Sequence, residues 1–321
     1  MLLSYWPRLL CLALFSLGII QIVLRLLLRV TMPFTNRIIG QMTARWQERF
    51  RFIVPAAPHM AALVLTVVVI ALPYIRNETN PLPERVGLAC GIGALAVAMR
   101  YLYGMLRAAR LLLQERQVHT FDGEPAVLIG GVQVHISEGS YPLLAVTGIF
   151  SPKIVISRQL LDNAAFSQDL LQIALAHENA HVSHRDNLKH LVLASLALSR
   201  SEKESSLRRW RYAAEIAADD DAVAGNSSRA ILLAETLLVA ARTIPCQGAS
   251  ALSLGLRPHE EELDKRIDRL LRDDLMPAPA MDATWRHAMG ATVLVFASVC
   301  GLLQLFATSI HRMSEFVLHI G

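Results

Sequence analysis

The sequence predicts a mainly α-helical integral-membrane protein with four transmembrane helices and one α+β domain inserted between the third and the fourth. Three observations lead to this prediction. Hydrophobic residues make up 53% of the 321 positions and charged residues only 18%, whereas soluble domains average about 45–50% and about 25%. The apolar residues gather in stretches of about 20, the length that crosses a bilayer as a helix. One long segment between two such stretches carries strand and helix patterns instead.

Four apolar stretches qualify as spans, and they divide the chain. The stretches cover about residues 9–28, 52–75, 86–106 and 288–310. We therefore expect a membrane domain over 1–106, an inserted domain over 107–287, a fourth span over 288–310 and a short tail over 311–321. A signal peptide is the alternative for the first stretch, but that stretch is long and no small-residue cleavage site follows it.

Arginines set the expected orientation of these spans. The first loop contains five of them, with Glu48 as its acidic residue: Arg29, Arg37, Arg45, Arg49 and Arg51. A second group follows the third stretch: Arg107, Arg110 and Arg116. Because positively charged loops remain cytoplasmic, we expect a multi-pass protein of the cell membrane, with a cytoplasmic inserted domain and both termini extracytoplasmic. The flanking arginines also explain the net charge of +4, so no direct nucleic-acid binding is expected.

Three polar residues interrupt the first two apolar stretches. Gln21 and Arg25 fall in the first stretch and His59 in the second. We expect Gln21 and Arg25 to make interface or interhelical contacts. Ionisable groups inside a membrane often mark a functional site, which is the minor alternative for His59.

The inserted domain begins with strand patterns and continues with helix patterns. Short strands are expected over 132–136, 144–147 and 153–156. Ser167 is a good N-cap for a helix that continues through His184. The polar run 201–206 is expected to form a loop. Further helices are expected over 187–198, 208–223, 228–242 and 258–271.

The first of these helices carries the residues His177-Glu178-Asn179-Ala180-His181, an H-E-x-x-H pattern. Two histidines four positions apart share one helical face, where both imidazoles can bind one Zn²⁺. Glu178 is offset beside that face and is expected to act as the general base toward the attacking water. The pattern alone is only moderately specific, because an ordinary surface helix can carry two exposed histidines.

A catalytic zinc site needs a third protein ligand and one open position. Glu215 is the candidate, since it lies on a later helix that can return to the first one after a loop. Asp219, one turn beyond it on the same face, is expected to accept the distal N–H of a ligand histidine and thereby orient that imidazole. A solvated acidic face is the alternative, which we prefer for Asp220 and Asp221. One Zn²⁺ per chain is therefore expected.

His184 competes with Glu215 for the role of third ligand. It lies seven positions from His177, about 10.5 Å along a helix axis, which is too far for ligands of one ion. We expect His184 at the rim of the site or in an ordinary polar role. His135 and His190 are not expected to bind the metal.

Three segments of the chain resemble the BlaR/MecR-type regulatory membrane metallopeptidases: Val146–Ile156, Ala176–Asp186 and Glu215–Asp219. HtpX-like membrane proteases share the same gluzincin core. The resemblance implies a gluzincin domain, with the ligands and base named above, that hydrolyses peptide bonds on the cytoplasmic side. It often implies signalling through cleavage of a transcriptional repressor or of the protease itself. Those relatives continue beyond the fourth span into a sensor, so we expect a stimulus to arrive through the spans, the outer loop or a partner protein.

The leading expectation is a membrane zinc metalloendopeptidase that acts on a peptide or protein substrate. Two alternatives stay open. One is an HtpX-like quality-control protease, and the other is a signalling or scaffold module in which zinc is structural and no turnover occurs. The intact Glu178 argues against the scaffold, because a structural site does not need a general base.

Overall fold

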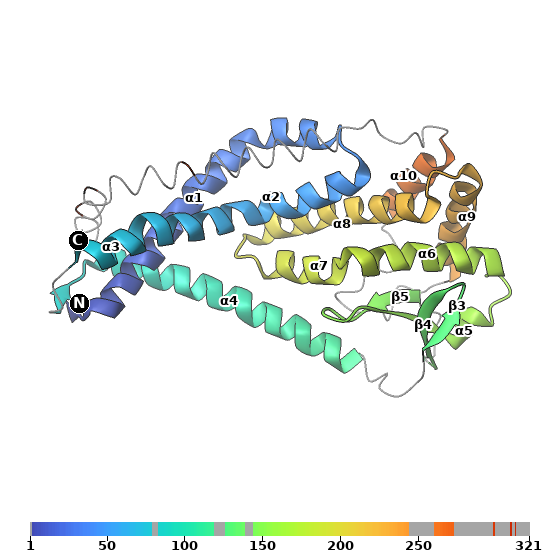
Figure 1. Cartoon of the computed structure of the whole chain (residues 1–321), viewed down its shortest axis with the longest axis horizontal. Coiled ribbons are helices and arrows are strands. Elements are labelled where there is room, and N and C mark those ends of the chain that lie inside the picture. The colour runs from blue at the N-terminus through green and yellow to red at the C-terminus, as the bar shows by residue number, and fades with distance from the viewer. Residues whose placement is uncertain are drawn as a thin grey trace. The chain divides into compact units, whose positions relative to one another are not determined.

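The computed structural model describes residues 2–78, 83–118, 126–138, 144–243 and 260–272, together with three single positions near the C-terminus (Figure 1). The described residues fall into two compact units. The first contains the described residues of Met1–Gln41, Ile53–Gly104 and Ala280–Gly321, and the second contains Met42–Phe52 and the described residues of Met105–Pro279. The fourth span predicted over 288–310 and the tail over 311–321 lie outside the described ranges.

Long helices form most of the first unit, and some of them continue into residues of the second. They are α1 (Tyr5–Ile39), α2 (Ala44–Leu65), the π-helical turn Thr66–Ala71, α3 (Leu72–Asn77) and α4 (Leu88–Val118). A two-residue strand β1 (Leu2–Leu3) pairs antiparallel with β2 (Glu84–Arg85). Among the described residues, three helical stretches are long and apolar enough to cross a membrane: Tyr5–Ile39, Ala44–Asn77 and Leu88–Glu115. These three stretches are consistent with a membrane protein.

The helices extend beyond the apolar stretches, which corrects the expected first loop. Arg29 and Arg37 lie in α1, and Arg45, Arg49 and Arg51 lie in α2. The connection between the two helices is only residues 40–43. Arginine is a good helix former, so the end of an apolar stretch does not end the helix. The arginines thus occupy helical positions rather than a flexible loop.

Polar side chains inside the first unit contact one another. Arg25 Nη2 lies 2.7 Å from His59 Nε2. Gln21 contacts both Tyr101 and Arg100. Large apolar side chains such as Val30 and Leu95 are instead exposed on the outside of α1 and α4. Such an arrangement, apolar outside with hydrogen-bonded polar groups inside, suits helices that face lipid.

The second unit contains a four-stranded sheet of order β3-β4-β6-β5. Its strands are β3 (Val127–Ile129), β4 (Val132–Ser137), β5 (Leu144–Thr147) and β6 (Lys153–Ser157). β4 and β6 are parallel, whereas the two outer pairings are antiparallel. All three predicted strands are present. The unpredicted β3 reaches β4 through Gly130 and Gly131, which both have positive φ, as a two-residue type I′ hairpin requires.

Helices follow the sheet. They are α5 (Arg158–Leu161), α6 (Gln168–His184), α7 (Asp186–Ser195), α8 (Arg200–Val223), α9 (Ser227–Thr243) and α10 (Glu260–Leu271). Ser167 caps α6 as predicted, since its Oγ accepts from Leu170 N–H at 3.3 Å. Arg185, in the left-handed conformation, ends α6 and begins α7.

The predicted loop over 201–206 is wrong, because these residues form the first turns of α8. Ser199 and Glu202 make a reciprocal capping box at the start of the helix. Such a box satisfies two backbone N–H groups that would otherwise lack partners. Arg200 and Glu204 add an exposed ion pair of 2.9 Å one turn apart. The polar composition of this run reflects a capped helix start, not irregular chain.

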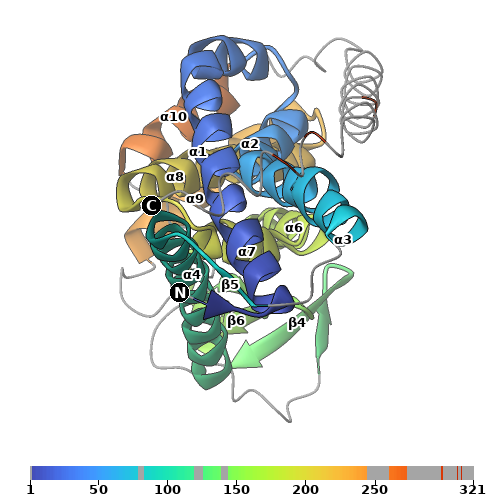
Figure 2. The ribbon, with the colours of Figure 1, turned by 90° about the vertical axis from the view of Figure 1, so that its left-hand side faces the viewer.

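The hydrophobic core of the second unit lies between the sheet and the helices. Both ribbon views place α6 and α8 on the same side of the sheet, with α6 in contact with β5, β6, α8 and α9 (Figures 1 and 2). Buried apolar residues from the sheet and from α6, α9 and α10 meet there, among them Val134, Ile154, Ile156, Leu170, Ile173, Leu233, Leu237 and Leu270. This packing fixes one face of α6 against the sheet and turns another toward α8.

Candidate metal centre

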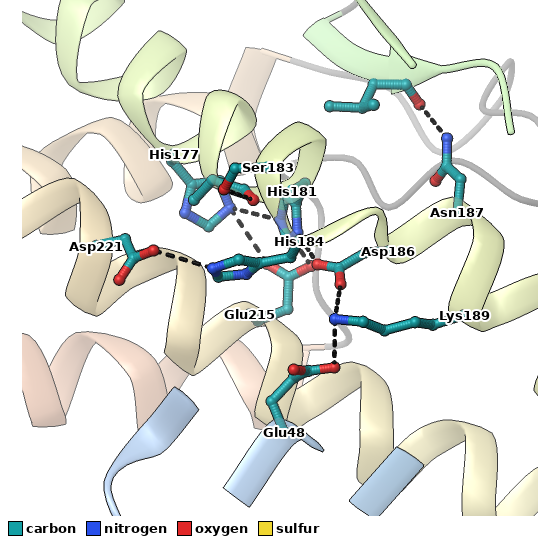
Figure 3. Close-up of polar contacts among 12 residues, drawn as sticks. Glu48, His177, His181, Ser183, His184, Asp186, Asn187, Lys189, Glu215 and Asp221 are labelled. Carbon is teal, nitrogen blue, oxygen red and sulfur yellow. Dashed lines mark hydrogen bonds and ion pairs between the residues drawn. The ribbon is translucent and has the colours of Figure 1, made fainter. Parts of the chain in front are cut away.

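Two imidazoles project from α6 toward a common point (Figure 3). His177 Nε2 lies 3.2 Å from His181 Nε2, and the two residues are only 0% and 2% exposed. The four-residue spacing places them on adjacent turns of one helical face. The helix therefore presents two buried ring nitrogens side by side.

Glu215 reaches the same point from α8. Its Oε2 lies 3.5 Å from His177 Nε2 and its Oε1 lies 3.7 Å from His181 Nε2. One ligand atom from each of the three residues lies within 4.8 Å of the others. The structure thus brings together the three metal ligands predicted from the sequence.

Each imidazole also contacts a carboxylate through its other ring nitrogen, Nδ1. Asp219 Oδ1 lies 3.0 Å from His177 Nδ1, which is the contact expected of Asp219. Asp186 Oδ2 lies 2.8 Å from His181 Nδ1, a contact that the sequence analysis missed. Asp186 follows the left-handed Arg185, so its side chain turns back toward the helix that has just ended. An acidic residue directly after the helix was the available signal.

The donor set fits a metal ion such as Zn²⁺. Each Nδ1 lies within 3.0 Å of a carboxylate oxygen, so the proton of each neutral imidazole belongs on Nδ1. Both Nε2 atoms then carry lone pairs, and two lone pairs at 3.2 Å repel unless a cation or a proton lies between them. Two histidines with one carboxylate is a donor set of catalytic zinc sites. The identity of the ion rests on this chemistry.

Glu178 is fully buried beside the three ligands. Burial raises the pKa of its carboxyl group to about 8; the charge of His181 opposes the rise and the charge of Glu215 adds to it. A cation held by the neighbouring residues would favour the ionised form again. A carboxyl group whose proton affinity depends on such a charge is suited to acid–base chemistry near neutral pH.

Arg266 on α10 is a further part of the centre that the sequence analysis missed. Its guanidinium contacts Glu215 Oε2 at 2.7 Å and Asp219 at 2.6 and 2.8 Å, and it is fully buried. Burial alone would raise the pKa of Asp219, but the Arg266 charge and the contact with His177 hold it well below its usual range. The charged pattern of α10 gave no sign that one arginine points into the core.

His184, His190 and Asp220 make other contacts. His184 Nε2 lies 3.0 Å from Asp221, and Arg211 Nη2 lies 2.7 Å from His190 Nε2. Asp220, expected on a solvated face, pairs with Arg269 at 2.6 Å. Within the described ranges, the group of side chains that could hold a metal ion does not include any of them.

Comparison with known families agrees with this geometry. The model of Peptidase family M48 matches residues 135–244, a segment that contains the histidines, Glu178, Glu215 and Asp219 but neither Glu48 nor Arg266. No curated protein matches the sequence. Members of Peptidase family M48 are typically zinc-dependent, so the match supports a zinc metallopeptidase for the segment that carries the metal centre.

Proposed function

We propose that this chain is a multi-pass membrane zinc metalloendopeptidase that cleaves peptide bonds on the cytoplasmic side. The observation that carries the proposal is the convergence of His177, His181 and Glu215 around one point, with the buried Glu178 beside them. A structural metal site needs the first three residues but has no use for Glu178. The match of the same segment to a peptidase family supports the assignment.

The roles of the residues follow from their positions. The two histidines and Glu215 would hold a zinc ion, which supplies Lewis acidity toward the peptide carbonyl and a more acidic water. Glu178 takes the proton from the attacking water and delivers it to the leaving amine. Asp219 and Asp186 keep the two imidazoles in the tautomer that leaves Nε2 available.

The substrate is proposed to bind as an added strand at β5. Among the strands between Val132 and Ile156, β4 and β6 each have a neighbour on both sides, whereas β5 is at the edge of the described sheet. Asn187 donates to the carbonyls of Val146 and Gly148 at 3.2 and 3.0 Å. A peptide bound along β5 would make hydrogen bonds to main-chain groups of this kind in place of Asn187. An inhibitor complex in which the peptide lies elsewhere would contradict this assignment.

A regulatory role of the BlaR/MecR type is the specific form of the proposal, with a transcriptional repressor or the chain itself as substrate. Comparison of cleaved peptides in membranes with wild-type protein and with Glu178→Gln tests it. One dominant repressor or self-cleavage product is the expected result. A broad set of damaged membrane proteins would instead indicate quality control, and no difference between the two samples would indicate a scaffold.

The cytoplasmic side of the centre is proposed from the arginines around α1 and α2. Reporter fusions at Gly321 and within 224–226, the turn between α8 and α9, are expected to report opposite sides of the membrane, because 201–206 lies inside α8. Signals from the same side would overturn the four-span arrangement.

A further inference from the structure

A chain of charged contacts leads from the start of α2 to the metal centre (Figure 3). Lys189 Nζ lies 2.9 Å from Glu48 Oε1 and 3.1 Å from Asp186 Oδ1. The other oxygen of Asp186 contacts His181 Nδ1 at 2.8 Å. Lys189 and Asp186, both on α7, therefore connect Glu48 on α2 to the imidazole of His181 on α6.

Glu48 is held firmly at the far end of this chain. It is 1% exposed, and its Oε1 accepts a hydrogen bond from Trp210 Nε1 at 2.8 Å in addition to the contact with Lys189. A buried carboxylate is costly unless charged and hydrogen-bonding partners surround it. Its neighbours Arg45 and Arg49 are exposed, so Glu48 alone of these three points into the domain.

Lys189 is the adjustable link. Its side chain is 20% exposed, and a lysine carries a flexible stem whose ammonium group can turn toward water. The contact with Glu48 holds the ammonium over Asp186. Asp186 then uses one oxygen for Lys189 and the other for His181, which fixes the plane of the carboxylate. The plane of that carboxylate in turn decides the orientation of the His181 ring.

We propose that Glu48 is a positioning residue of the metal centre, which orients His181 through Lys189 and Asp186. The start of α2, a helix that continues into a candidate span, then takes part in holding the metal. This inference rests on the proposed metal site. Partners behind a metal-binding histidine usually change metal affinity about 10–100-fold. Glu48 acts two contacts further back, so we expect a loss of about 5–10-fold.

The test measures zinc affinity of the full-length protein in detergent by competition with a chelator. Glu48→Gln keeps the shape of the side chain but removes its charge, and Lys189→Met removes the link. Each is expected to weaken zinc binding by about 5–10-fold, and the double variant no more than the stronger single one, because both break the same chain. The visible spectrum of the Co²⁺-loaded protein is expected to shift in both, since the orientation of a ligand changes.

Trp210→Phe is the matched control. It removes the other hydrogen bond to Glu48 and disturbs packing, but leaves the link to Lys189 in place. We expect zinc affinity within about twofold of the wild type. An equal loss of zinc affinity in Trp210→Phe would attribute the effect to packing. Additive losses in the double variant would show that Glu48 and Lys189 act independently of each other. Either result overturns the inference.

His181→Ala separates this inference from the proposed function. It is expected to lose zinc. Unchanged affinity in both Glu48→Gln and Lys189→Met, with loss in His181→Ala, would refute the role of Glu48 alone. Full zinc occupancy in His181→Ala would refute the metal site itself. Because Lys189→Met interrupts the same chain from another helix, a Glu48→Gln protein that fails to fold does not prevent the test.

Discussion

The two histidines of the proposed metal site are held in different ways. Behind His177 stand Asp219 and Arg266, which we term the Asp219 arm, and behind His181 stand Asp186 and Lys189, the Asp186 arm, which ends at Glu48. The Asp219 arm is fully buried and uses a two-point guanidinium contact. The Asp186 arm uses a partly exposed lysine. The difference indicates that one arm is part of the folded core and the other is open to adjustment.

The rate of peptide hydrolysis should depend on Glu178 more strongly than on either arm. Glu178→Gln is expected to lower hydrolysis by about 10²–10⁴-fold, the usual contribution of general acid–base catalysis, while zinc content stays at one per chain. The measurement is peptide cleavage together with metal analysis of the purified protein. Glu215→Gln is the comparison, because it weakens a ligand and should lower both zinc affinity and rate. Full activity in Glu178→Gln would move the scaffold hypothesis to first place.

The Asp219 arm should matter most for stability. Arg266→Met leaves the carboxylates of Asp219 and Glu215 buried without their cation, and breaking a buried pair in this way costs about 3–5 kcal/mol. Arg269→Met removes a partly exposed pair with Asp220 from the same helix and should cost under about 1 kcal/mol. Unfolding of the two variants in detergent compares them. Equal costs would show that burial does not distinguish the pairs.

The same arm should make the metal-free protein sensitive to acid. The folded-state pKa of Asp219 is held below its usual value by Arg266 and His177, so its stabilisation is present above the unfolded-state pKa of about 3.9 and is lost as the pH falls toward the folded-state value. Asp219→Asn should therefore be less stable than the wild type from neutral pH down to about pH 4. Below that, the difference should shrink. A difference that grows on acidification would contradict the assignment.

The smallest effect is expected outside both arms. His184 contacts Asp221 rather than the metal ligands. His184→Gln should change zinc affinity by less than about twofold, since neither arm is altered. Chelator competition on this variant checks it. A tenfold loss would mean that the centre includes His184, as the sequence alone allowed.

Some local features could be predicted because they depend on neighbours along the chain. The four-residue spacing of His177 and His181 places both rings on one face of any α-helix, and Ser167 caps that helix through a contact three residues away. The expected loop over 201–206 failed for a local reason as well. Its polar composition outweighed the capping pair of Ser199 and Glu202 in the prediction, although the pair was visible in the sequence.

The sequence by itself determined the apolar helices and the H-E-x-x-H face. It also indicated Glu215 as the third ligand and Asp219 as the carboxylate that orients a ligand histidine. Only the tertiary structure decided which charges stand behind them. Glu48 meets Lys189 across 141 positions, and Arg266 meets Asp219 across 47. Such pairs leave no periodic pattern, because a buried charge is selected by a partner on another helix and not by its own neighbours. The three candidate metal ligands and Asp219 were thus readable from the sequence, whereas Asp186, Arg266 and Glu48 were not.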